Sequence, residues 1–266
     1  MAEKNSTKPN SANYADEILQ KLLQDGEVSV DDLARDLKVS PSTIRRSLSS
    51  LENKGLLSRT HGGAVLVEHS LYEPFRNVSS FQEQEKNRSV EKRLIGLAAA
   101  ELIKDGDIIA ISAGTTTTQV ARSIRHRKGI TVITNAVNIA MELSHREDLS
   151  VRVTGGTLSG AWFALVGTRA IAGISEFFVD KAFIGVDGID LKNGLTTNYP
   201  DQAAIHRAML KQARQKIVVA DHQKVNKTGK AQICPLSEVE IFITDSKIPK
   251  KDISEFNKHG IKVIKT

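Results

Sequence analysis

The stretch VSPSTIRRSLSSLENKGLLSRTHGGAVL, residues 39–66, decides how the first part of this chain folds. Ser40 is a typical helix N-cap, Pro41 suits the first helical turn, and Lys54-Gly55 is a typical helix end. The apolar positions between them recur at helical spacing and are Ile44, Leu48 and Leu51. A helix is therefore predicted from Pro41 to about Lys54.

A hairpin follows this helix and two helices precede it. His61-Gly62-Gly63 suits a hairpin tip between two strand-like runs. The two preceding helices are predicted at 14–24 and 30–37, and the two strands of the hairpin at Leu56–Arg59 and Ala64–Val67. This order, with a tight turn over Leu37–Ser40, is that of a winged helix-turn-helix, which we expect over residues 13–67 after a disordered tail at 1–12.

The charges of this segment are polarised. Residues 13–36 hold seven acids and two bases, whereas residues 37–64 hold five bases and one acid. A surface that faces DNA phosphates needs such a basic concentration. Arginines on a helix also serve solubility alone, but here the cap, the turn, the polarity and the hairpin all favour DNA binding.

The third helix and the hairpin supply the candidate DNA contacts. Arg45 and Arg46 point about 100° apart on a helix, so one can read a guanine while the other holds a phosphate. Hydroxyls at the helix start and the hairpin tip can reach phosphates or base edges. The DNA-binding candidates are Ser40, Ser42, Thr43, Arg45, Arg46, Arg59, Thr60 and His61.

Composition sets the broad class. The chain has 266 residues, 40% hydrophobic and 26% charged, with a formal net charge of +6, which fits two globular domains. The single cysteine, Cys234, excludes an internal disulfide and is expected to be a small buried hydrophobe. We found no signal peptide, membrane-spanning run, metal motif or cofactor motif, and we expect a cytoplasmic protein.

The second half alternates between strand and helix. After a hinge at 68–82 and a long helix over Glu83–Lys104, seven strands are predicted, most of them separated by helical segments. They are Asp107–Ile111, Ile130–Ile133, Ser150–Val153, Lys181–Gly185, Ile217–Ala220, Ile241–Thr244 and Lys262–Ile264. Such alternation predicts an α/β domain over 83–266 with a mostly parallel sheet covered on both faces.

A hydroxyl-rich loop follows the first of these strands. Gly114-Thr115-Thr116-Thr117-Thr118 lies between a strand and a helix start, where backbone N–H groups, hydroxyls and the helix dipole favour an anion. The loop is neither a Walker loop nor a dinucleotide fingerprint. A capped helix with no ligand is the alternative interpretation.

Further polar residues follow other strands, and ligands bind beyond the carboxyl ends of parallel strands. There Lys224 can neutralise a phosphate and Asp187 can accept from sugar hydroxyls; turn chemistry and an exposed lysine are the plainer interpretations. The candidate effector residues are Gly114, Thr115, Thr116, Thr117, Thr118, Asn135, Gly155, Gly156, Asp187, Gly188, Asp221 and Lys224.

These motifs together resemble the deoxyribose-operon-repressor (DeoR) family of bacterial regulators, over nearly the whole chain from Tyr14. The resemblance rests on residues 39–46, 51–56 and 59–64 and on the polar motifs of the second half, including Gly194–Thr197. It implies a sensor domain similar to ribose-5-phosphate isomerase and coenzyme A transferase folds, sugar-phosphate effectors, homo-oligomers and usually repression. Two departures stand out: Ser47 replaces a usual Asp, and His222-Gln223 fill an Asp-x-x-Lys motif that often holds Ser.

Two other functions fit parts of this pattern. A sugar-phosphate isomerase fused to a DNA-binding arm would use Asp187 as its base, but no second catalytic group stands at a motif-like spacing. An architectural DNA-binding protein would use its second domain only for assembly. We therefore expect a sequence-specific regulator, most simply a repressor of a carbohydrate operon, that binds double-stranded operator DNA and a phosphorylated sugar.

Overall fold

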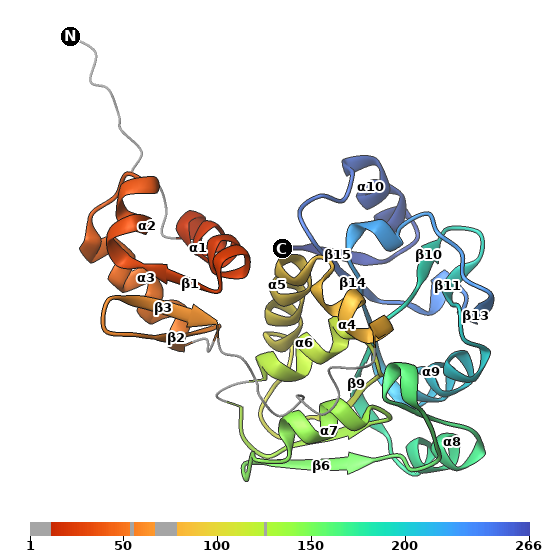
Figure 1. The fold of residues 1–266 in the computed structure, drawn as a ribbon. Helices are drawn as coiled ribbons and strands as arrows, with labels where there is room; N and C mark the ends of the chain where they lie inside the picture. Colours follow the sequence, from red (N-terminus) through yellow and green to blue (C-terminus); the bar gives the residue numbers. More distant parts are fainter. Residues whose placement is uncertain (1–11, 54–55, 67–78, 125–126) are drawn as a thin grey trace. The chain divides into compact units, whose positions relative to one another are not determined.

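The computed structural model describes residues 12–53, 56–66, 79–124 and 127–266. The chain divides into two compact units, within residues 1–70 and 71–266 (Figure 1). The expected tail at 1–12 lies almost wholly outside the described residues, as does most of the expected hinge at 68–82.

The first unit is a winged helix-turn-helix, as predicted. Its helices are α1 (Ala12–Asp25), α2 (Val30–Asp36) and α3 (Pro41–Asn53), and its strands are β1 (Glu27–Ser29), β2 (Leu57–Arg59) and β3 (Gly63–Leu66). The strands form an antiparallel sheet in the order β1-β3-β2. The core is made of fully buried side chains from all three helices and the wing, among them Ile18, Leu22, Leu33, Ile44, Leu48 and Leu57.

Local hydrogen bonds explain where these helices begin. The Ser29 hydroxyl accepts from the backbone N–H of Asp32 at 3.0 Å, and the Ser40 hydroxyl accepts from that of Thr43 at 3.2 Å. Strand β1 was not predicted, because three residues are too few for an alternating pattern. It lies against Gly63, where a Cβ atom would stand 1.8 Å from the Val28 carbonyl oxygen, so this position requires glycine.

The second unit is built on a seven-stranded parallel sheet, and every one of its strands was predicted. The sheet order is β15-β14-β12-β9-β4-β5-β6. The strands are β4 (Ile108–Ile111), β5 (Ile130–Thr134), β6 (Leu149–Val153), β9 (Val179–Ile184), β12 (Ala213–Val219), β14 (Ile241–Thr244) and β15 (Lys262–Lys265).

Helices cover both faces of this sheet (Figure 1). Alternate residues of each strand join opposite cores: Ile109 and Ile111 pack with α5, α6 and α7, whereas Ala110 packs with α8, α9 and α10. The helices are α5 (Ser89–Ala100), α6 (Thr115–Ser123), α7 (Val137–Leu143), α8 (Thr168–Ser175), α9 (Pro200–Gln212) and α10 (Lys250–Lys258).

The strand order reverses beside β4. From β4 the chain moves outward through β5 to β6, and it later returns to β9 on the other side and moves outward to β15. The crevice beyond the carboxyl ends of β4 and β9 is thus the topological switch point, where ligands bind in open α/β sheets.

The prediction of one long helix over Glu83–Lys104 is wrong. The structure has α4 (Ser79–Lys86), then a break, then α5. Arg88 adopts a left-handed conformation with φ 55°, which a continuous helix does not allow. Helix α4 also begins inside the range expected to be a hinge.

Helices α5 and α6 pack backbone against backbone at Gly96. A Cβ atom at this position would lie 2.5 Å from the Gln119 carbonyl oxygen, so no larger residue fits without moving the helices apart.

Two small antiparallel elements were not predicted. One is the hairpin of β7 (Thr157–Ser159) and β8 (Ala164–Val166), joined by a 3₁₀ turn at Gly160–Trp162. The other is a three-stranded sheet with the order β10-β11-β13. Its strands are β10 (Gly188–Asp190), β11 (Gly194–Thr197) and β13 (Ala231–Cys234).

Candidate functional site

The third helix of the first unit presents an exposed polar surface. Ser40, Ser42, Arg45 and Arg46 are exposed, and Thr43 is half-buried. Within the described part of the chain, neither arginine takes part in an ion pair. Acidic residues of the segment 13–36 pair with bases of the same segment: Asp36 pairs with Lys21 and Asp32 with Arg35. Both arginines are therefore available to an anionic partner.

The wing is fastened to the same helix. The Arg59 guanidinium donates to the Ser49 hydroxyl at 3.0 Å, and the Arg59 backbone N–H donates to the Glu52 carboxylate at 3.0 Å. Thr60 and His61 lie exposed at the tip. Ser47, which departs from the family pattern, is only 8% exposed and faces the core side of α3 rather than the exposed side.

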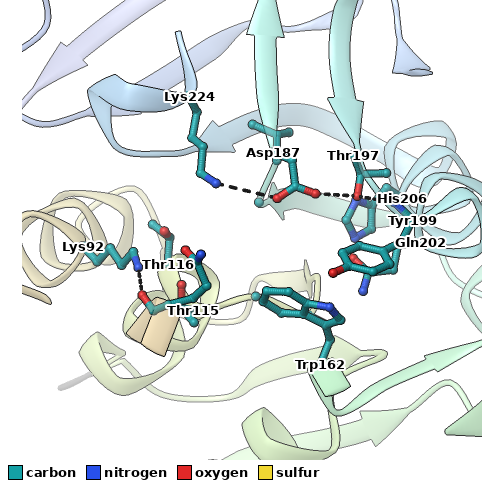
Figure 2. A pocket seen from close by; sticks show the side chains of 15 residues that line it. Lys92, Thr115, Thr116, Trp162, Asp187, Thr197, Tyr199, Gln202, His206 and Lys224 are labelled. Carbon is teal, nitrogen blue, oxygen red and sulfur yellow. Dashed lines mark hydrogen bonds and ion pairs between the residues drawn. The ribbon is translucent and has the colours of Figure 1, made fainter. Parts of the chain in front are cut away.

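A pocket lies in the second unit at the switch point (Figure 2). Its walls come from the ends of β4 and β9, the starts of α5, α6 and α9, parts of α4 and β11, and the 3₁₀ turns at Gly160–Trp162 and His222–Lys224. Figure 2 shows two ends: Lys92, Thr115, Thr116 and Lys224 lie toward one, and Tyr199, Gln202 and His206 toward the other.

The start of α6 forms the first end. Gly114, Thr115 and Thr116 line the pocket, and no side chain of the described residues caps this helix. The hydroxyls of Thr117 and Thr118 both donate to the Gly114 carbonyl oxygen, at 2.9 and 2.7 Å, and are fully buried. Of the four threonines, two therefore line the pocket and two hold the loop.

Two lysines stand opposite this helix start. Lys92 is 4% exposed and donates to the Gln84 carbonyl oxygen. Burial lowers the pKa of Lys92 to about 8, and the nearby Asp221 carboxylate opposes that shift. Lys224 lies 3.7 Å from the Asp187 carboxylate. This end is suited to an anion, because a helix N-terminus and two cations face the same space.

Asp187 separates the two ends of the pocket. One of its carboxylate oxygens faces Lys224, and the other accepts from the Thr197 hydroxyl at 3.0 Å and the Asn198 N–H at 2.8 Å. The far end holds Gln202 and His206 from α9 and the rings of Trp162 and Tyr199, whose centroids are 5.5 Å apart. Burial lowers the pKa of His206 to about 4, so this ring is neutral at neutral pH.

The structure brings five of the twelve predicted effector residues to the pocket: Gly114, Thr115, Thr116, Asp187 and Lys224. The other seven do not line it. Besides Thr117 and Thr118, these are Asn135, Gly155, Gly156, Gly188 and Asp221.

Structural roles account for their placement. Asn135 accepts from the Ala113 N–H and donates to the Leu165 carbonyl oxygen, and so joins three segments. Gly156 and Gly188 are close-packing positions, where a Cβ atom would lie 2.6 Å from the Val166 carbonyl oxygen and 2.2 Å from that of Lys227. Gly155 is exposed in the turn before β7. Asp221 caps a 3₁₀ turn and lies 3.9 Å from Arg88.

Several pocket residues escaped the sequence analysis. They are Gln84, Lys92, Trp162, Tyr199, Gln202 and His206, together with Thr197, noted only as part of a family motif. Gln84 and Lys92 fell within the supposed continuous helix, and Gln202 and His206 look like ordinary positions of α9. Their spacing of four residues on one helix face was the one available signal.

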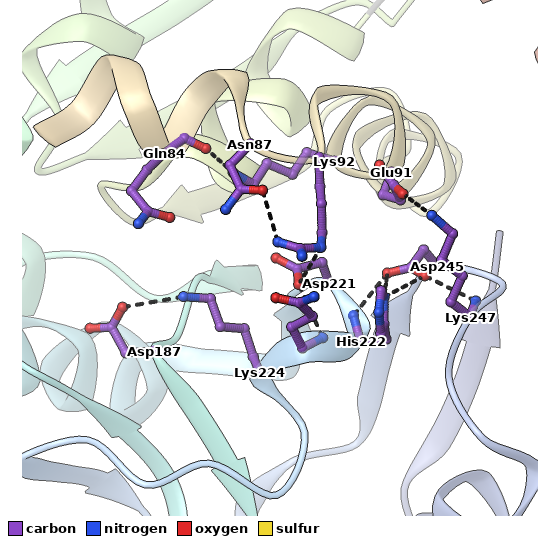
Figure 3. Close-up of polar contacts among 12 residues, drawn as sticks. Gln84, Asn87, Glu91, Lys92, Asp187, Asp221, His222, Lys224, Asp245 and Lys247 are labelled. Carbon is purple, nitrogen blue, oxygen red and sulfur yellow. Dashed lines mark hydrogen bonds and ion pairs between the residues drawn. The ribbon is translucent and has the colours of Figure 1, made fainter. Parts of the chain in front are cut away.

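A band of ion pairs ties the start of α5 to the loops after β12 and β14 (Figure 3). Arg88 faces Asp221, Lys247 pairs with Glu91 at 2.6 Å, and the His222 ring lies 2.9 Å from Asp245. Because η3 (His222–Lys224) also carries Lys224, this band positions both lysines of the pocket.

The architecture defines a class of protein. The first unit is a winged helix-turn-helix whose third helix exposes two arginines, and the same chain carries an α/β unit with a polar pocket. This is the arrangement of a transcription regulator. No group of three or more potential metal ligands occurs among the described residues, and none of their helices is long and apolar enough to cross a membrane.

Comparison with known proteins gives the family. Residues 15–70 match the DeoR-like helix-turn-helix domain and residues 87–246 match the DeoR C-terminal sensor domain. The chain belongs to the DeoR family of transcriptional repressors. It is therefore a DNA-binding regulator and not an enzyme, which excludes the isomerase alternative.

Two relatives illustrate the match. A putative aga operon transcriptional repressor of Escherichia coli O157:H7 is 33% identical over 94% of this chain and 91% of its own length. The glycerol-3-phosphate regulon repressor of Escherichia coli (strain K12) is 30% identical over 92% and 95%. Among solved structures, ribose 5-phosphate isomerase A of Methanocaldococcus jannaschii is similar to half of the chain (50%, and 53% of its own), with a TM-score of 0.38 at 18% identity.

Proposed function

We propose that this repressor binds a phosphorylated sugar in the pocket at the switch point, and that binding changes its affinity for operator DNA. The observation that carries the proposal is the convergence of Lys92, Lys224 and the uncapped start of α6 on one space. Helix N–H groups and two ammonium groups favour a phosphate over an uncharged ligand. A phosphorylated compound also appears in the name of one relative, the glycerol-3-phosphate regulon repressor.

The proposal includes a route from the pocket to the DNA-binding unit. Gln84 of α4 lines the pocket, and its carbonyl oxygen accepts the hydrogen bond of Lys92. A phosphate that recruits Lys92 competes with this carbonyl and so alters how α4 is held. Helix α4 follows β3 along the chain, after residues 67–78. A ligand acts this way only if it binds two arrangements with different affinity, typically by about 1–3 kcal/mol.

On the DNA side we propose that α3 enters the major groove, with Arg45 and Arg46 sharing base and phosphate contacts. The hydroxyls of Ser40, Ser42 and Thr43 form one hydrogen-bonded group at the helix start, with oxygens 2.8 and 2.9 Å apart. Thr60 and His61 of the wing, with Arg59 beside α3, complete this surface. We expect the functional unit to be a homo-oligomer.

The experiment measures operator affinity by fluorescence anisotropy, with and without phosphorylated sugars and their unphosphorylated parents. A phosphorylated sugar should change the affinity several-fold, and its parent should not. Lys224→Ala and Thr116→Val should abolish the response. Thr117→Val should weaken the response less than Thr116→Val, because the Thr117 hydroxyl is bonded to Gly114 and does not reach the pocket.

Three results would count against the proposal. Equal potency of sugar and sugar phosphate, or a full response in Lys224→Ala, would place the anion site elsewhere. Silence toward every phosphorylated compound would favour the alternative in which the second unit serves only for assembly.

A further inference from the structure

The far end of the pocket holds buried polar atoms without partners. His206 is 1% exposed, and both of its ring nitrogens lack a hydrogen-bond partner within the described part of the chain. The indole nitrogen of Trp162 is likewise buried and unpaired. Both residues line the pocket (Figure 2). Buried polar groups are nearly always paired, so unpaired ones on a pocket wall indicate a polar ligand.

The electrostatics of this end differ from those of the phosphate end. His206 is neutral, with a pKa lowered by burial to about 4, so one ring nitrogen donates and the other accepts. The Asp187 carboxylate acts electrostatically on His206 and repels a second anion from this end. Lys224 offsets the charge of Asp187, and Thr197 and Asn198 donate to its other oxygen, so a cation gains less there than beside a free carboxylate.

One kind of group fits these partners. A neutral imidazole offers a donor and an acceptor, and an indole N–H offers a donor. A hydroxyl both donates and accepts, so adjacent hydroxyls can satisfy all three atoms. The Trp162 and Tyr199 rings supply an apolar wall for the carbon skeleton, and Phe81 holds the Trp162 ring edge-on at 6.4 Å between centroids.

We propose that His206 and Trp162 read the uncharged, hydroxyl-bearing end of the ligand, so that the pocket selects a sugar or polyol phosphate over inorganic phosphate and over ligands charged at that end. This inference rests on the proposed function, since it takes the phosphate to lie at the α6 end. It assigns specificity to His206 and Trp162, and affinity for the phosphate to Lys92, Lys224 and the start of α6.

The test compares affinities within each variant by calorimetry. The probes are inorganic phosphate, glycerol 3-phosphate, glucose 6-phosphate and glucosamine 6-phosphate. In the wild type, the tighter-binding of glycerol 3-phosphate and glucose 6-phosphate should bind at least about tenfold tighter than inorganic phosphate. Glucosamine 6-phosphate, which carries a charged amino group, should bind no tighter than glucose 6-phosphate. His206→Leu and Trp162→Phe should each lower the ratio of sugar-phosphate to phosphate affinity about fivefold or more. His206→Gln, which keeps a donor and an acceptor, should restore part of that ratio.

The possible results distinguish failure of this inference from failure of the proposed function. An unchanged ratio in Trp162→Phe and in the folded His206 variants overturns the inference, as does tightest binding of glucosamine 6-phosphate. If a His206 variant does not fold, Trp162→Phe decides alone, because it keeps an aromatic ring in place. If the wild type binds none of the four probes, the proposed function itself fails. Lys224→Met separates the two ends, since it should weaken all phosphorylated probes alike and leave the ratio intact.

Discussion

At the scale of single residues, we expect Lys92 to make binding of the proposed ligand depend on pH. Its pKa is about 8 in the ligand-free protein, because burial disfavours the charged form. A bound phosphate raises this pKa again, so binding takes up a proton at pH values above about 8. Sugar-phosphate affinity should fall as pH rises, and be on the order of tenfold weaker at pH 9.5 than at pH 7.5. Calorimetry in buffers of different ionisation enthalpy measures both the affinity and the proton uptake.

The control for this prediction is Lys92→Arg. Arginine stays charged throughout this range, so the variant should lose the pH dependence above pH 8. The effect on folding has the opposite sign. The unfolded chain keeps the ordinary lysine pKa of 10.5 and binds more protons between pH 8 and 10.5, so the contribution of Lys92 to stability rises with pH there. A wild-type affinity that does not change from pH 7.5 to 9.5 contradicts the assignment of Lys92 to the ligand.

Residues differ in how well the sequence predicts their place. Thr115 and Thr116 were predicted because a strand, a glycine and hydroxyls in a row describe a local anion site. Lys92 and His206 were not, because a lysine or histidine on a helix has no local signal. Lys92 and His206 reach the pocket only because β4 pairs with β9 and α9 packs nearby. This placement depends on tertiary structure and not on local sequence.

At the scale of elements, α3 should account for both the sequence specificity and the salt dependence of DNA binding. Loss of the base-reading arginine, Arg45 or Arg46, should cost about 1–3 kcal/mol and relax specificity at one position. Loss of the phosphate-binding one should weaken all sequences alike and lower the salt slope by about one. Anisotropy titrations of Arg45→Ala and Arg46→Ala at several salt concentrations distinguish the two.

Arg35→Ala is the matched control, since Arg35 is also exposed but lies on α2 in an ion pair with Asp32. It should leave specificity and salt slope near those of the wild type. Two arginine variants that bind operator as the wild type does would remove α3 from the interface.

The elements that were predicted share a cause, and so do those that were missed. Central parallel strands such as β4, β9 and β14 are buried and appear as apolar runs, so the sequence pattern finds them. The edge strands β6 and β15 are partly exposed and were found because they alternate with helical segments. The break at Arg88 follows no glycine or proline and leaves the apolar pattern intact on both sides, so it gives no signal. Strand β11 pairs with β13 from a distant part of the chain, and the short hairpin of β10 and β11 has only three and four residues in its strands, so it carries too little pattern.

At the scale of the whole molecule, we expect DNA binding by at least a dimer. Helix α3 has 13 residues, and one such helix with a wing buries too little surface for tight specific binding. Footprinting should show inverted or direct repeats spaced by whole helical turns of about 10–10.5 base pairs. Sedimentation at micromolar concentration should show a dimer or larger species. A monomer that protects a single half-site would be the opposite result.

Gly96 has a mechanical consequence for such an assembly. The backbones of α5 and α6 touch at Gly96 and Gln119, so we expect these two helices to move as one rigid unit. Both helices contribute residues to the phosphate end of the pocket. Among the described residues, helix α4 is held by contacts that involve side chains: Phe81 packs on aromatic rings, Glu85 pairs with Arg122, and the Gln84 carbonyl oxygen accepts from Lys92. A ligand that pushes on the pocket wall displaces first the helix that is held by the weakest contacts. If a phosphate binds as proposed, we expect α4 to shift more than α5 and α6, and α4 is the helix that follows the winged helix along the chain.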